Sequence, residues 1–125
     1  MHADPAQLAA IRAEFRRLTN LTAGELSAFL DTPESHKVGT TRRGEAESVG
    51  RQSARRILAI LTTPDDGLTE ADHDHMRKVV AFRRRHLAQR PFGDVSRSRW
   101  RWSLMNWGHD PTRPPRGPTP QNQAS

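Results

Sequence analysis

The densest group of possible metal ligands in this chain is the run Asp72-His73-Asp74-His75. Successive residues of a helix point about 100° apart, so His73 and His75 would not converge on one ion. His86 would share a side of that helix with His75, but about 16 Å would separate the two along the axis. We therefore expect no metal site and no cofactor.

A second candidate is the corner Gly108-His109-Asp110-Pro111. We favour a structural role, in which Asp110 forms an Asx turn and His109 covers the tryptophan face of the preceding helix. A metal site built from distant residues would need His36, or His109 with Asp110. The sequence leaves open the roles of five histidines: His36, His73, His75, His86 and His109.

The residues needed for covalent catalysis are not arranged in a recognisable pattern. The chain has no cysteine, which excludes disulfides and cysteine nucleophiles. It has no G-x-S-x-G turn for an activated serine and no G-x-x-x-x-G-K-[ST] phosphate loop. We therefore expect a protein that is not an enzyme and has no catalytic residues.

Charge is divided unevenly along the chain. Residues 1–76 carry 9 Lys/Arg and 12 Asp/Glu, a net charge of −3, whereas residues 77–125 carry 11 and 2, a net charge of +9. The basic half indicates a polyanionic partner such as nucleic acid. The alternatives are a solvated basic surface, or pairing with the acidic half within one chain or between chains.

Nine basic side chains are candidates for phosphate contacts, six on outward helix faces and three around the first tryptophan. They are Arg55, Arg56, Arg77, Lys78, Arg84, Arg85, Arg97, Arg99 and Arg101. No helix-turn-helix spacing marks a recognition helix, so we expect DNA binding of low sequence specificity. Trp102 is a candidate for stacking on a base, although packing on a second element is favoured.

The elements that must position these residues centre on residues 96–111, which hold all three tryptophans. Trp100, Leu104 and Trp107 are spaced i, i+4 and i+7, so they share one face of a short helix and are predicted to anchor the core. Gly108 can end this helix and Pro111 prevents its continuation. We expect the tryptophan helix to close the domain against the first and fourth helices.

Two helices are predicted before residue 32. Asp4 and Pro5 mark the start of the first, whose apolar stripe ends near Leu18. Thr22 and Glu25 fit a capping box at the start of the second. Residues 32–47 are polar and are predicted to form a long surface loop.

A third helix is predicted over about residues 48–61, and a fourth and longest from a cap at Thr69 to about Gln89. Arg83 falls within the apolar stripe of the long helix. Because an unpaired buried charge destabilises a fold, we expect Arg83 to extend to solvent or to meet a carboxylate.

The sequence thus predicts an all-α fold, a small compact bundle of about five helices in a single domain over residues 1–111. Residues 112–125 contain four prolines and are predicted to form a disordered tail. No apolar run approaches the roughly 18 residues that span a membrane, so we expect a cytoplasmic protein, nucleoid-associated if it binds DNA.

Five stretches of the chain resemble a family of small microbial proteins catalogued as domain of unknown function 3140. They are E-S-V-G at 47–50, S-A-R-R-I-L at 53–58, D-H-D-H-M-R-K-V-V at 72–80, R-H-L-A-Q-R-P at 85–91 and S-R-W-R-W-S-L-M-N-W-G-H-D-P at 98–111. The resemblance spans roughly residues 20–111. Two positions differ from the family pattern, which has an apolar residue at Arg83 and Tyr at Trp102.

Some members of that family are labelled DNA-binding proteins, and the resemblance implies no catalytic residues. It therefore favours non-enzymatic nucleic-acid binding through the basic helix faces. The alternative is a protein-interaction or structural module that binds another protein or a second copy of itself and has no role in nucleic-acid binding.

Overall fold

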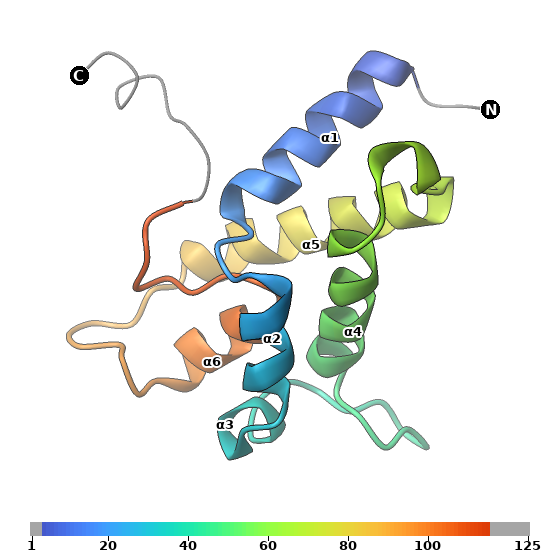
Figure 1. Ribbon diagram of the computed structural model, residues 1–125. Coiled ribbons are helices and arrows are strands. Elements are labelled where there is room, and N and C mark those ends of the chain that lie inside the picture. Colours follow the sequence, from blue (N-terminus) through green and yellow to red (C-terminus); the bar gives the residue numbers. More distant parts are fainter. Residues whose placement is uncertain (1–3, 116–125) are drawn as a thin grey trace, which may run out of the picture.

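The structure, a computed structural model, describes residues 4–115, and this part of the chain is all-helical (Figure 1). Six α-helices follow one another: α1 (Pro5–Leu18), α2 (Ala23–Leu30), α3 (Pro33–His36), α4 (Val49–Leu61), α5 (Glu70–Leu87) and α6 (Arg99–Asn106). A single 3₁₀ turn, Asp65–Gly67, precedes α5. The all-α prediction is confirmed. None of the helices between residues 4 and 115 has the length and apolar character needed to cross a membrane.

The helix starts follow from local side-chain chemistry. At each start a short polar side chain accepts a hydrogen bond from a backbone N–H of the first turn. That N–H has no acceptor within the helix itself. These N-caps are Asp4, Thr22, Thr32, Ser48, Thr69 and Ser98. The predicted capping box of Thr22 with Glu25 is present, and the predicted cap Thr69 forms a second capping box with Asp72.

The short helix α3 lies inside the segment predicted to be a loop. Its Ser35 is completely buried, donates a hydrogen bond to Asn106 Oδ1 at 2.6 Å and accepts one from Arg51 at 2.7 Å. Val38, just after α3, is also buried. These contacts come from distant parts of the chain, which explains why a polar sequence adopts ordered structure here.

Helix α5 runs across the molecule in Figure 1, and the other helices pack on it or on one another. Helix α1 packs along α5, and α2 packs along α4. The main partners of α6 are α2, α3 and α4, with a smaller contact to α5. The prediction that the tryptophan helix closes the domain against the first and fourth helices is therefore right only for the fourth predicted helix, α5, and it missed the larger contacts with α2, α3 and α4. The segment after α6 reaches the end of α1, where His109 binds Leu18 and Asp110 binds Asn20.

The predicted core anchors are buried but belong to two apolar clusters. Trp107 lies in the larger one, which includes Leu26, Ile57 and Met76. Trp100 and Leu104 form a smaller cluster with Val95. Trp100 and Leu104 pack on the loop before α6 and on α5, whereas Trp107 packs among residues of α1, α2, α4 and α5.

Arg83 neither extends to solvent nor meets a carboxylate, contrary to the prediction. Its side chain is fully buried, and its guanidinium donates to Trp107 O, Phe15 O and Thr19 Oγ1, each at 2.9 Å. It also lies over the Phe15 ring, 5.2 Å from the centroid. Burial lowers the pKa of Arg83 to about 9, which leaves the group charged at neutral pH. Its donors thus join the end of α1 to the end of α6.

Asp110 and Asn20 join the same two chain segments. Asn20 donates to Asp110 O at 2.9 Å and accepts from Asp110 N at 2.7 Å. The Asp110 carboxylate accepts from Arg101 and from Thr112, and the bond from Thr112 N forms the predicted Asx turn. Burial would raise the pKa of Asp110, but these hydrogen bonds outweigh it and lower the pKa to about 2.

His109 is buried, and its Nδ1–H donates to Leu18 O at 2.6 Å, which fixes the ring against the end of α1. Beyond it, Arg113 forms an ion pair with Glu25. The rest of the predicted tail, residues 116–125, lies outside the described residues.

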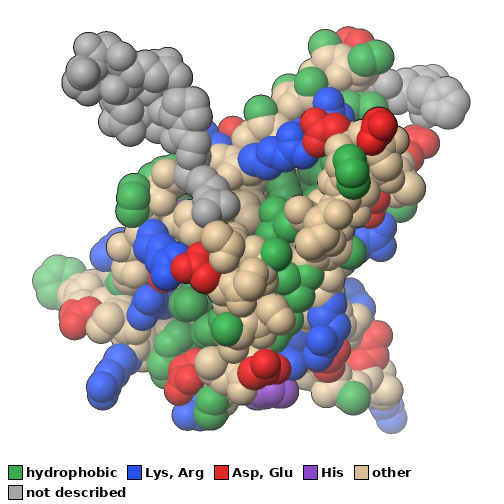
Figure 2. Space-filling model, in the orientation of Figure 1, with side chains coloured by type: hydrophobic (Ala, Val, Ile, Leu, Met, Phe, Trp, Pro, Cys, Tyr) green, Lys and Arg blue, Asp and Glu red, His purple; other side chains and the backbone are tan. Residues whose placement is uncertain are grey.

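Positive and negative side chains are interleaved on the face shown in Figure 2. Many cations there lie beside carboxylates. Three ion pairs within residues 4–115 join the acidic and basic halves of the sequence within one chain: the local pair of Arg77 with Asp74 at 2.7 Å, Arg84 with Glu14 at 3.7 Å and Arg113 with Glu25 at 2.9 Å.

Candidate functional site

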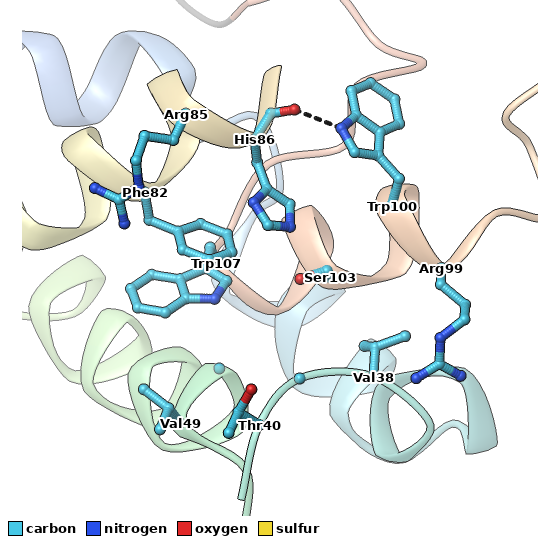
Figure 3. Close-up of a pocket in the computed structure, with 12 residues that line it drawn as sticks. Val38, Thr40, Val49, Phe82, Arg85, His86, Arg99, Trp100, Ser103 and Trp107 are labelled. Carbon is cyan, nitrogen blue, oxygen red and sulfur yellow. Dashed lines mark hydrogen bonds between the residues drawn. The ribbon is translucent and has the colours of Figure 1, made fainter. Parts of the chain in front are cut away.

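An open cleft of about 630 Å³ lies between α4, α5 and α6, and the segment 38–40 borders it (Figure 3). Its lining contains three aromatic side chains, Phe82, Trp100 and Trp107, together with one histidine, His86. It also contains two arginines and two hydroxyl side chains, but no Asp or Glu. A volume of this size is typical of sites for small molecules.

Stacked rings form one wall of the cleft. His86 stacks on Phe82 with ring centroids 4.2 Å apart, and Phe82 stacks on Trp107 at 4.1 Å. On the far side of Trp107, His75 lies nearly parallel at 6.5 Å. Trp100 donates its indole N–H to His86 O, which fixes α6 against the end of α5. The stack holds the rings in defined positions.

Several polar groups that face the cleft make no hydrogen bond within residues 4–115. The most buried is the indole N–H of Trp107, a residue only 9% exposed. The hydroxyls of Ser103 and Thr40 and the imidazole nitrogens of His86 also have no partner in the described part of the chain. Figure 3 shows the indole nitrogen on the ring edge that faces Ser103 and Thr40. A buried donor without an acceptor is unusual and calls for an explanation.

Helix spacing places three of the lining residues on the same side of α5. Phe82, Arg85 and His86 are spaced i, i+3 and i+4 on α5, so they share one side of that helix. Gly50 in the first turn of α4 allows the close approach of α6, since a Cβ there would lie 3.1 Å from Trp107 Nε1. The cleft thus depends on a glycine that makes room for an indole.

The electrostatics of the cleft favour a negatively charged ligand. Arg85 and Arg99 line it, and neither forms an ion pair within the described chain. Burial and the charge of Arg85 lower the pKa of His86, so its ring is neutral at pH 7 and offers one donor and one acceptor. The start of α4 adds the positive end of a helix dipole.

A second hollow of about 520 Å³ shares Val49 and Trp107 with the cleft. It is lined by four cations: Arg42, Arg55, Arg56 and Lys78. His75 lies there too, with Nε2 2.9 Å from Ser53 Oγ. Burial, followed by repulsion from Arg56 and Lys78, lowers the pKa of His75 to about 4.

The nine basic residues predicted to contact phosphates divide into two sets. Five form ion pairs with carboxylates: Arg55 with Glu47, Arg56 with Asp72, Arg77 with Asp74, Arg84 with Glu14 and Arg101 with Asp110. The other four, Lys78, Arg85, Arg97 and Arg99, form none within residues 4–115.

The unpaired cations are not scattered evenly. Lys78 lines the second hollow, and Arg85 and Arg99 line the cleft. Arg97 lies apart, in a hollow with Phe29 and Trp102. The ring of Trp102 is partly buried there, and Lys37 Nζ lies 6.0 Å from its centroid.

The histidines do not gather around a common point. Within residues 4–115 no three His, Asp or Glu side chains are placed to hold a metal ion. His73 is buried, donates from Nδ1 to Thr69 O at 2.8 Å and accepts from Arg12 at 3.0 Å. The burial of His73 indicates a structural role for this part of the D-H-D-H run.

Sequence reasoning missed the polar groups that face the cleft. Trp107 was predicted as a core anchor, and its burial agrees with that prediction. Whether its N–H finds an acceptor depends on which residues of other elements lie beside it, and the sequence does not show this. Thr40 and Gly50 carried no signal of their own. The only available hint was the spacing of Phe82, Arg85 and His86, which sets a cation beside two rings.

Comparison with known proteins identifies the family of the chain. No curated protein and no solved structure matches it. A family model described as protein of unknown function (DUF3140) matches residues 14–105, which include all six helices in whole or in part. The chain belongs to this family.

Proposed function

We propose that this protein binds nucleic acid without catalysing a reaction, through cations on α5 and α6. The observation that carries the proposal is the position of the unpaired candidates. Lys78, Arg85 and Arg99 line two adjoining hollows that share Trp107. Cations without a carboxylate partner are the ones free to replace the counterions of a phosphate backbone.

The arrangement of these cations suits an extended polyanion. Lys78 and Arg85 are seven residues apart on α5, which puts them on one side of the helix about 10 Å from each other along its axis. Arg99 extends the row onto α6. By contrast, Arg55, Arg56, Arg77, Arg84 and Arg101, which were also predicted contacts, are compensated by carboxylates and are expected to contribute less.

The test is fluorescence anisotropy of labelled duplex and single-stranded DNA of random sequence, measured at several salt concentrations. In the variant Lys78→Gln/Arg85→Gln/Arg99→Gln we expect weaker binding and a dependence of log K on log salt that is shallower by about 2 to 3. The matched control, Arg16→Gln/Arg77→Gln/Arg84→Gln, removes the same charge from residues that are already paired.

The comparison between the two variants decides the location of the interface. Equal losses of affinity would show that only net charge matters and would contradict a defined surface. No binding by the unmodified protein at low salt would exclude the function. Sedimentation of the same samples tests the alternative of self-association, which has less support because Glu14 and Glu25 meet basic partners within one chain.

A further inference from the structure

We propose that the cleft between α4, α5 and α6 binds a nucleoside monophosphate, with the phosphate at the start of α4 and with Arg85 and Arg99 at the two ends of the cleft. This inference goes beyond nucleic-acid binding, because it concerns a small ligand and needs no strand to be bound. Free nucleotides and the phosphorylated end of a strand present the same chemistry, and the experiment below distinguishes them.

The buried indole N–H of Trp107 requires an acceptor from the ligand. Trp107 is only 9% exposed, and its Nε1 has no hydrogen-bond partner within residues 4–115. An indole nitrogen can only donate, and a buried donor without a partner destabilises the fold. The open side of the ring faces Ser103 and Thr40, whose hydroxyls are also without partners (Figure 3). A ligand rich in acceptors would satisfy all three groups.

The charge of the lining identifies the acceptor group as an anion. Arg85 of α5 and Arg99 of α6 lie at opposite ends of the lining in Figure 3, and the lining contains no carboxylate. Val49 and Gly50 are the first two residues of the 13-residue helix α4, and the Gly50 N–H has no acceptor in the described structure. The helix N-terminus, in a lining that contains two arginines and no carboxylate, suits a phosphate, which carries up to two charges and several acceptor oxygens.

The rest of the cleft suits a flat ring attached to that phosphate. Apolar and aromatic side chains, among them Val38, Phe82 and Trp100, line the remaining surface. His86 stacks on Phe82, and its neutral imidazole supplies one donor and one acceptor. A nucleobase presents complementary donors and acceptors along its edge. A phosphate alone would leave this apolar part of the cleft without contacts.

The experiment is isothermal titration calorimetry of the full chain with AMP, GMP, CMP, UMP, adenosine and inorganic phosphate. We expect saturable binding of at least one monophosphate and at least about tenfold weaker binding of adenosine, since each charge-assisted phosphate contact is strong. Arg99→Gln, Ser103→Ala and Trp107→Phe should each weaken monophosphate binding. Trp107→Phe keeps an aromatic ring against Phe82 and removes only the N–H and part of the ring.

Two controls keep the test decisive. Arg97→Gln and Trp102→Phe alter a cation and an aromatic ring outside the cleft. The affinity of these two variants for the monophosphate should stay within about twofold of the affinity of the unmodified protein. Thermal unfolding checks that each variant folds. If Trp107→Phe does not fold, Arg99→Gln and Ser103→Ala carry the test, because both side chains lie at the edge of the cleft.

Oligonucleotides with and without a 5′-phosphate distinguish the two sources of the ligand. Binding of free monophosphates, with no gain from a 5′-phosphate, would support a free nucleotide as the ligand. A gain from the 5′-phosphate with no binding of free nucleotides would support a strand end. Absence of both, or affinities that Arg99→Gln and Ser103→Ala leave unchanged, would overturn the proposal. Neither the binding of free monophosphates nor a gain from the 5′-phosphate depends on the salt-sensitive DNA binding proposed above.

Discussion

Two basic side chains, one fully and one partly buried, differ in their charge at neutral pH. Arg83 is fully buried and keeps its charge, because three oxygens accept its hydrogen bonds and the Phe15 ring lies beside it. His75 is partly buried beside Trp107 and close to the cations Arg56 and Lys78, and it is therefore neutral at pH 7. The first residue stabilises the fold as a cation, whereas protonation of the second should destabilise it.

We predict a loss of stability between about pH 6.5 and pH 4 that depends on His75. Its pKa is about 4 in the folded state, against an ordinary 6.5. In this window the unfolded chain binds more protons, so the free energy of unfolding falls as the pH falls. After allowance for solvent screening of a partly exposed group, the loss is on the order of 1–2 kcal/mol.

Urea unfolding at about pH 7 and about pH 4.5 measures this effect. Burial also lowers the pKa values of His86 and His109, so the unmodified protein should lose stability from several groups. The variant His75→Gln should lose less over the same interval. An equal loss in the two proteins would contradict the role assigned to His75. Asp110, with a pKa of about 2, affects only more acidic solutions.

At the scale of the elements, helix starts and ends could be predicted because their causes are local. Thr22, Thr69 and Ser98 accept N–H groups only three residues away, and such spacings are visible in the sequence. Helix α3 could not be predicted in this way, because the burial of Ser35 depends on Asn106 and Arg51.

The candidate site was predictable only in part. The basic residues were visible in the sequence, but which of them remain unpaired depends on where carboxylates from other elements lie. Arg84, for example, is paired by Glu14 of α1, 70 positions earlier in the chain. The cleft itself requires α4 to approach Trp107 at Gly50, a contact that no local pattern encodes.

Gly108, which follows α6, gives a prediction at this scale. Its φ is +80°, and a Cβ there would lie 2.9 Å from an Arg83 nitrogen. Gly93 has a similar φ of +88° but open space around it. We expect Gly93→Ala to destabilise by about 1 kcal/mol from backbone strain alone. Gly108→Ala should destabilise by at least about 2 kcal/mol, since it also displaces the Arg83 donors.

Chemical denaturation of both variants measures the difference. Because the two glycines share the same backbone requirement, Gly93→Ala serves as the control for strain. Similar losses of stability in the two variants would show that Arg83 adapts freely, and would contradict the importance assigned to its three hydrogen bonds.

At the scale of the whole molecule, contacts between the end of α1 and the segment after α6 close the apolar core. Arg83, Asn20 and His109 all connect the end of α1 to the segment after α6. The same closure brings Trp107 between α4 and α5 and so creates the cleft. Stability and the proposed ligand site therefore depend on the same residue.

We predict that Trp107→Ala destabilises the protein by about 3–5 kcal/mol, because a large buried side chain is replaced by a cavity. The indole packs on Phe82 of α5 and Gly50 of α4, so its removal loosens three helices together. Trp102→Ala is the control: that ring is only partly buried, and its removal should destabilise by at most about 2 kcal/mol. Thermal and urea unfolding measure both variants. Equal effects, or no change in Trp107→Ala, would show that the domain is not closed around this indole, and the cleft would then lack the rigid wall that the proposed nucleotide site requires.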